Sequence, residues 1–192
     1  PYKRYAIGNV WRNEKSGNAR YREFTQADVD IIGNINKSQA DAEICNIIAD
    51  TLIKSGLSDN QFKVSISNRK IVQGLINNLK ITNKVQELKV IRAIDKLDRI
   101  GLKGVEDLLK KERVDTSGAI TKGANLSDIQ ASEILNFLKI NNLKDLKSIL
   151  KNSLSVVGIK ETEDLLEIIS YGKYAKLIQP NFTIVRGLAY YD

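Results

Sequence analysis

Polar and apolar side chains alternate over residues 20–31, and this alternation constrains the fold more than any other feature of the chain. The segment reads Arg-Tyr-Arg-Glu-Phe-Thr-Gln-Ala-Asp-Val-Asp-Ile, and a period of two predicts a β-strand. We expect the apolar face to pack inward against a core. The polar face would carry Arg20, Arg22, Phe24, Gln26, Asp28 and Asp30, and the apolar face Tyr21, Thr25, Ala27, Val29 and Ile31.

The segment before this strand predicts its partner in a β-hairpin. Residues 4–12 form a β-rich run, and residues 13–18 read as a polar turn. Arg12 and Arg20 would then lie at the two ends of one loop. Guanidiniums, a ring, an amide and carboxylates on one strand face could hold a phosphate, a flat base and an ammonium group. The alternative is a polar outer face that binds no ligand.

The rest of the chain is predicted to be mostly helical. Gly101, residues 115–123, residues 141–142 and Gly158 are the expected breaks between helices. A third strand is expected at residues 62–66, and a final strand at 178–189 with Pro180 at its start. The predicted helices are residues 39–55, 70–79, 84–99, 103–112, 127–139, 143–151 and 161–170.

Strands near both ends enclose this helical stretch, which predicts an α+β fold. We expect a mostly antiparallel sheet formed by residues 1–69 and 176–192. Residues 70–175 would form an α-helical insertion domain. Basic residues in that insertion could contact phosphates, but acidic Glu106, Asp107 and Glu112 are interleaved, so a solvated amphipathic face is the alternative. The basic residues are Arg92, Lys96, Arg99, Lys103, Lys110, Lys111 and Arg113.

Amino-acid composition limits which binding partners and metal sites the chain can have. The net charge is +7, an excess that permits polyanion partners without requiring them. No stretch approaches the roughly 20 apolar residues that a membrane span needs. The single cysteine, Cys45, fits a small core residue in a reducing cytoplasm, and the absence of histidine argues against a structural zinc site.

Two signatures at opposite ends of the chain resemble a known family. The run from Trp11 to Asp30 resembles motif 2 of the class II aminoacyl-tRNA synthetases in its histidyl-tRNA synthetase version. Residues 185–191, Val-Arg-Gly-Leu-Ala-Tyr-Tyr, are similar to the histidine-specific signature of that family. Residues 39–43 and 64–69 also recur there in this order. The resemblance implies the class II type of sheet, with the inserted helical domain associated with the tRNA acceptor stem.

The resemblance also implies roles for residues around ATP, which Mg²⁺ would accompany. Arg12 would hold the α-phosphate and the amino acid carboxylate, and Glu14 would approach the adenine amino group. Arg20 would reach toward the distal phosphates, and Phe24 would stack on the base. Arg12 and Arg186 would flank the α-phosphate as the two catalytic cations, although a surface ion pair is the alternative for Arg186 alone.

The histidine side of the site follows from the same resemblance. Gln26 and Asp30, with Arg12 and Arg186 at the carboxylate end, would receive the amino acid. Tyr190 and Tyr191 would form the wall of the imidazole pocket. No protein metal ligand is implied. Ala189 replaces the usual aspartate of the signature, and Lys15-Ser16 replaces an Arg-Pro pair in the motif 2 loop.

The leading hypothesis is a fragment of a histidine-specific ligase catalytic domain, from motif 2 to the histidine signature. The parent would activate L-histidine with ATP, transfer it to tRNA(His), pair as a homodimer through motif 1 and be cytoplasmic. Motifs 1 and 3 and an anticodon-binding domain have no counterpart here, so the chain alone is expected to be inactive. The alternatives are a non-catalytic paralogue, such as the regulatory subunit of ATP phosphoribosyltransferase or a sensor of uncharged tRNA, and a general basic RNA-binding module.

Overall fold

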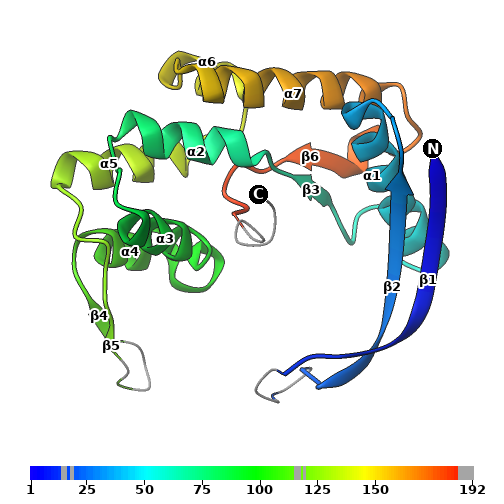
Figure 1. Cartoon of the computed structure of the whole chain (residues 1–192), viewed down its shortest axis with the longest axis horizontal. Helices are drawn as coiled ribbons and strands as arrows, with labels where there is room; N and C mark the ends of the chain where they lie inside the picture. The colour runs from blue at the N-terminus through cyan, green and yellow to red at the C-terminus, as the bar shows by residue number, and fades with distance from the viewer. Residues whose placement is uncertain (14–16, 18–19, 115–117, 119, 186–192) are drawn as a thin grey trace.

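A computed structural model of the chain describes residues 1–13, 17, 20–114, 118 and 120–185. A long β-hairpin extends downward from one end of a group of helices, and helix α7 (Ser153–Ser170) runs along the top toward that end (Figure 1). Helix and strand occur together, as the α+β prediction requires. In the described part, two of the three two-stranded sheets are antiparallel, whereas β3 (Val64–Ile66) and β6 (Ile178–Pro180) pair in parallel.

The predicted hairpin is confirmed. Strand β1 (Tyr2–Trp11) pairs antiparallel with β2 (Glu23–Ile32), and the register places Gly8 opposite Gln26. Beyond β1, the Arg12 backbone N–H donates to the Arg22 carbonyl at 2.8 Å, so pairing continues toward the turn. The polar residues of β2 therefore share one face, as their period of two requires.

The expectation that the other face packs into a core is wrong. Tyr5, Ile7 and Trp11 on that face are 76%, 69% and 69% exposed, and Tyr21 and Val29 are also exposed. Helix α1 (Lys37–Lys54) approaches the face but leaves a cavity of about 420 Å³, lined on the helix side by Ile47 and Thr51. A two-stranded ribbon offers too little surface to close such a face by itself.

The smaller of the two cores in the described part of the chain forms where α1 meets the parallel β3–β6 pair. Ala42, Cys45 and Ala49 of α1 are buried there at helical spacing, together with Ile178 of β6. The prediction that Cys45 is a core residue is confirmed, and burial raises the pKa of its thiol. Asn36 caps α1 by accepting a hydrogen bond from the Gln39 N–H.

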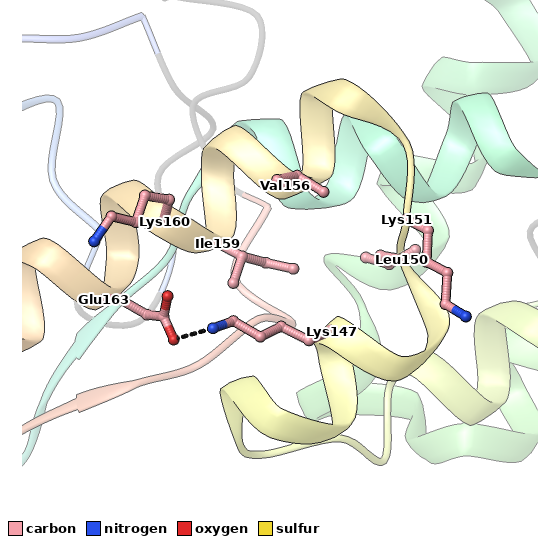
Figure 2. A pocket seen from close by; sticks show the side chains of 7 residues that line it. All are labelled: Lys147, Leu150, Lys151, Val156, Ile159, Lys160 and Glu163. Atoms are coloured by element: carbon pink, nitrogen blue, oxygen red, sulfur yellow. Dashed lines mark ion pairs between the residues drawn. The ribbon is translucent and has the colours of Figure 1, made fainter.

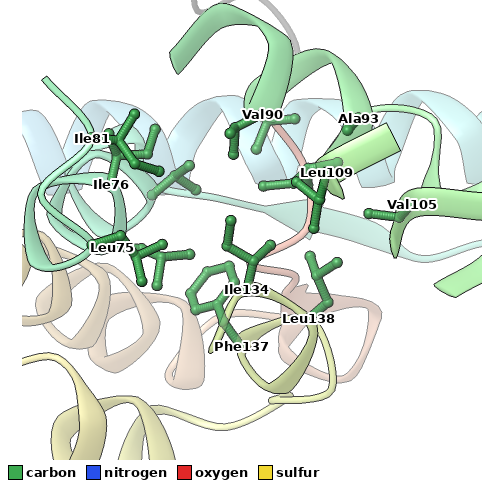
Figure 3. Close-up of a cluster of buried hydrophobic side chains, with 14 of the residues drawn as sticks. Leu75, Ile76, Ile81, Val90, Ala93, Val105, Leu109, Ile134, Phe137 and Leu138 are labelled. Carbon is green, nitrogen blue, oxygen red and sulfur yellow. The ribbon is translucent and has the colours of Figure 1, made fainter. Parts of the chain in front are cut away.

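The larger core lies among the remaining helices. Phe137 and Ile134 are fully buried against Leu75, Val90 and Leu109 (Figure 3). None of the helices in the described residues is long and apolar enough to cross a membrane. The helices are α2 (Arg69–Asn78), α3 (Lys84–Ile94), α4 (Leu97–Lys110), α5 (Asp128–Phe137), α6 (Leu143–Ile149) and α7.

The predicted helix over residues 84–99 is wrong in its extent, because α3 ends at Ile94 and α4 begins at Leu97. Gly101 does interrupt the helical backbone inside α4, with φ at 65°. The break expected at residues 115–123 contains a strand that we did not predict, β5 (Ile120–Thr121), which pairs with β4 (Arg113–Val114) in a short hairpin.

The predicted helix break at Gly158 is also wrong, because α7 continues from Ser153 to Ser170. Gly158 lies against α2, where a Cβ atom would come 2.8 Å from Lys70 Cβ and 3.1 Å from the Ile71 nitrogen. The glycine therefore permits close helix packing instead of ending the helix. This distinction depends on the tertiary contact and not on the local sequence.

The last strand is shorter than predicted. β6 ends at Pro180, which is its final residue and not its first. Asn181 then accepts hydrogen bonds from the Thr183 backbone N–H at 3.1 Å and hydroxyl at 2.7 Å, and this local turn stops the extended backbone. The predicted strand residues 186–189 lie outside the described residues.

Helix α7 packs against both α1 and α2 and so joins the two cores. Ile169 and Tyr174, which we assigned to the insertion, are buried in the smaller core. Tyr174 also donates a hydrogen bond to Asp50 of α1. The division of the chain near residues 69 and 176 stays a prediction.

We predict that Gly158→Ala lowers the free energy of unfolding by about 2 kcal/mol, because the new methyl group overpacks the α2–α7 contact. The gain in helix propensity from the same change is smaller, roughly 1 kcal/mol. Denaturant unfolding measures the difference, with Val157→Ala on the exposed side of α7 as control. Equal or greater stability of Gly158→Ala would contradict this packing argument.

Candidate active site

The polar face of the hairpin carries four of the predicted site residues, Arg12, Phe24, Gln26 and Asp30. Phe24 lies opposite Val10, Gln26 opposite Gly8, and Asp30 opposite Arg4. Phe24, Gln26 and Asp30 are partly buried, whereas the intervening Thr25, Ala27 and Val29 are exposed. We call this face, formed by Arg4, Gly8, Arg12, Phe24, Gln26, Asp28 and Asp30, the ladder.

Arg12 is held at one end of the ladder by two contacts. Its Nη2 donates a hydrogen bond to Gln26 Oε1 at 2.9 Å, and its guanidinium carbon lies 5.2 Å from the centre of the Phe24 ring. A cation over an aromatic face is attracted by the ring quadrupole. The guanidinium is thus oriented before any ligand arrives.

Gln26 uses both ends of its amide. While Oε1 accepts from Arg12, Nε2 donates to both carboxylate oxygens of Asp28 at 2.8 Å. Asp28 is a residue of the ladder to which we assigned no role from the sequence. The alternation of side chains already placed Asp28 on this face, so the sequence contained enough information to include it in the site.

Asp30 has a partner that the sequence analysis did not anticipate. Arg4 Nε donates to Asp30 Oδ2 at 2.6 Å across the two strands. Residues paired directly across antiparallel strands bring their side chains together. The pair could be found only once the register of the hairpin was known.

Open space lies above Gly8, between the two arginines of the ladder. A Cβ atom built on Gly8 would meet no atom within 4 Å. Ala6, also small, lies opposite Asp28. The middle of the ladder therefore has small residues on β1, which leave space for a ligand, and hydrogen-bonding side chains on β2.

The remaining predicted site residues lie at the hairpin turn or outside the described residues. Arg20 pairs with Gly17 through two backbone hydrogen bonds at the turn and is exposed. Glu14, Arg186, Tyr190 and Tyr191 lie outside the described residues. The convergence of Arg12 and Arg186 on one phosphate stays a prediction.

Two other cavities are lined by charged side chains of both signs. The cavity of about 540 Å³ beside the α1 and α2 N-termini contains Asp41, whose pKa is raised by burial and by Glu161. For Glu161, burial also raises the pKa, but hydrogen bonds from Lys70 and Asn68 leave it lowered overall. A cavity of about 360 Å³ between α6 and α7 has an apolar floor with Lys147 and Glu163 paired at 2.6 Å (Figure 2).

A basic groove lies on the helical part of the chain. The cavity, about 460 Å³, is lined by Lys89, Arg92 and Lys96 of the α3 region and by Lys122 after β5, with Asp95 among them. Lys110, which we predicted as a phosphate contact, is instead paired with Glu106 at 2.8 Å and with Asp128 at 2.9 Å. Within the described residues, no three His, Cys, Asp or Glu side chains gather as a metal site.

Comparison with known proteins decides the family. The sequence matches the model of histidyl-tRNA synthetase over residues 1–192. The chain belongs to the histidyl-tRNA synthetase family. It is 68% identical to a histidine–tRNA ligase of Pelagibacter ubique and 39% identical to one of Ruegeria pomeroyi, in each case over the whole chain. It spans 42% and 40% of the length of these two relatives.

Solved structures agree with this family assignment. Histidyl-tRNA synthetase from Nostoc sp. PCC 7120 is similar with a TM-score of 0.78 and 26% identity, over 100% of this chain and 42% of that one. A Bacillus halodurans protein, described as an ATP phosphoribosyltransferase regulatory subunit/histidyl-tRNA synthetase, has a TM-score of 0.76 at 21% identity, over 100% of this chain and 46% of that one. At that identity the second likeness concerns the fold alone, so it does not favour the regulatory alternative.

We predict that Gly8→Val blocks ligands from the ladder without destabilising the hairpin. The new side chain meets no protein atom at its Cβ, and a valine favours strand backbone more than glycine does. In the full-length protein, calorimetric titration should show weakened binding of histidine, while the unfolding temperature stays unchanged or rises. Ile7→Val on the opposite face is the control, and unaltered histidine binding by Gly8→Val would contradict a ligand site above Gly8.

Proposed function

We propose that the full-length protein containing this chain is a histidine–tRNA ligase. It activates L-histidine with ATP to form histidyl-adenylate and then transfers the histidyl group to tRNA(His). The observation that carries the proposal is the oriented guanidinium of Arg12, held by Gln26 and Phe24 on the face of a motif 2 hairpin. Membership of the histidyl-tRNA synthetase family supports it.

The chemistry of adenylate formation explains why such a guanidinium is needed. Attack of the histidine carboxylate on the α-phosphate of ATP builds negative charge on the phosphate oxygens, and pyrophosphate leaves. A fixed cation stabilises that charge without having to reorganise during the reaction. Arg12 would meet this charge from one side and Arg186 from the other.

The other ladder residues would bind the two substrates. Phe24 would offer its ring to the adenine, while Glu14 and Arg20 would contact its amino group and the distal phosphates. Gln26 would receive the α-ammonium group beside Asp28. Asp30 would take the imidazole, with the ring enclosed by Tyr190 and Tyr191.

Mg²⁺ would enter this site together with ATP. Asp28 accepts two hydrogen bonds from Gln26, and Asp30 is paired with Arg4, so the ladder carboxylates already have partners. Mg²⁺ in nucleotide sites is typically held by substrate phosphates with few protein ligands. When bound, the ion would neutralise charge on the phosphates, while the residues of the ladder orient the reactants.

The basic groove is the part of the helical region that we propose for phosphate contacts with tRNA. Arg92 and Lys96 were predicted for this role, and Lys89 and Lys122 extend their group within one cavity. Ion pairing of Lys110 with two carboxylates makes it a poorer candidate. From the same family resemblance we propose that the full-length protein is a cytoplasmic homodimer.

We predict that the full-length protein exchanges pyrophosphate into ATP only when histidine is present. Arg12→Ala and Arg186→Ala should each lower the exchange rate about 100-fold or more, because each removes a cation from the charged transition state. Lys139→Ala, which removes an exposed lysine elsewhere, is the matched control.

Absence of histidine-dependent exchange in the unmodified full-length protein would overturn the proposed ligase. Exchange that persists unchanged in Arg186→Ala would remove only Arg186 from the chemistry.

A further inference from the structure

The ion pair between Arg4 and Asp30 has the geometry of a contact that orients a ligand-binding carboxylate. The two residues are direct partners in the hairpin register, and Arg4 Nε reaches Asp30 Oδ2 at 2.6 Å. Arg4 lies on the same face of β1 as Gly8, at the opposite end of the ladder from Arg12. The contact uses one carboxylate oxygen, and a carboxylate can accept further hydrogen bonds at the other.

The Arg4–Asp30 ion pair contributes too little to folding stability to explain its presence by that contribution alone. The Arg4 and Asp30 side chains are 51% and 43% exposed, and ion pairs at such exposure contribute little to stability. The same strand offers a comparison, because Lys3 pairs with Glu43 of α1 at the same 2.6 Å and with similar exposure. Lys3 points to the opposite face of the hairpin, away from the ladder.

The spacing along β2 fits one amino acid. Gln26 leans toward Asp28, since its amide nitrogen contacts both oxygens of that carboxylate. From Asp28 to Asp30 is one step of the same face, about 7 Å by strand geometry. An amino acid with one ring can place its ammonium group at the Gln26–Asp28 pair and its ring at Asp30.

We propose that Arg4 is a positioning residue, which holds Asp30 so that its second oxygen accepts a hydrogen bond from the imidazole N–H of histidine. This inference rests on the proposed ligase function and adds a residue to it. Arg4 also balances the charge of Asp30, so the pocket does not require a cationic side chain. Arg4 acts through Asp30 and does not touch the reacting atoms.

The test compares Arg4→Gln, Arg4→Lys and Lys3→Gln in the full-length protein by histidine-dependent pyrophosphate exchange. For Arg4→Gln we expect the KM for histidine to rise about tenfold, the effect of a hydrogen bond to a charged group. The KM for ATP and kcat should change by less than about twofold, because Arg12 and its contacts remain. Arg4→Lys keeps the positive charge and should give a smaller rise in the KM for histidine.

Lys3→Gln removes an equally short and similarly exposed ion pair from the same strand, so it measures the effect of losing a surface ion pair that has no role in ligand binding. Its KM for histidine should stay at the unmodified value, and the thermal unfolding temperatures of Arg4→Gln and Lys3→Gln should agree within a few degrees. Equal KM values for Arg4→Gln and Lys3→Gln, in a protein that does exchange, would overturn the role of Arg4 alone. No histidine-dependent exchange in the unmodified protein would overturn the ligase and this inference together.

Discussion

The register of the β1–β2 hairpin is the constraint on which the candidate site depends. With Gly8 opposite Gln26, the side chain of Arg12 reaches the Gln26 amide at 2.9 Å, and Asp30 faces Arg4. A shift of one residue would move the side chains of one strand to the other face of the ribbon and separate Arg4 and Arg12 from Asp30 and Gln26. The backbone pairing thus determines which charges meet, before any ligand contributes.

The helices serve this arrangement by supporting the base of the hairpin. Lys3 pairs with Glu43 of α1, and α1 shares a core with β3, β6 and α7. Helix α7 then continues onto α2, where Gly158 allows close packing, and so joins the base of the hairpin to the larger helical core. The apolar face of the hairpin, with Tyr5 and Ile7, stays exposed because the helices do not cover it.

Local patterns in the sequence predicted the hairpin, the polar face of β2 and most helices. A period of two and a run of polar turn residues are properties of the backbone, and asparagines at helix starts such as Asn36 satisfy N–H groups locally. The predictions that were wrong or missing concerned contacts between residues far apart in the sequence. Gly158 reads as a helix break until α2 is placed beside it, and the Asp30–Arg4 pair needs a register that the sequence did not specify. The apolar face was assigned to a core because alternation indicates which residues share a face but not whether anything covers it.

The central claim is that Arg12 and Arg186 converge on one phosphate of the adenylate. A crystal structure of the full-length protein with histidine and a non-hydrolysable ATP analogue tests it most directly. We predict that both guanidiniums lie within hydrogen-bonding distance of α-phosphate oxygens while Arg12 keeps its contact with Gln26. An α-phosphate bound away from the ladder, or an Arg186 side chain directed to a different cavity, would contradict the account.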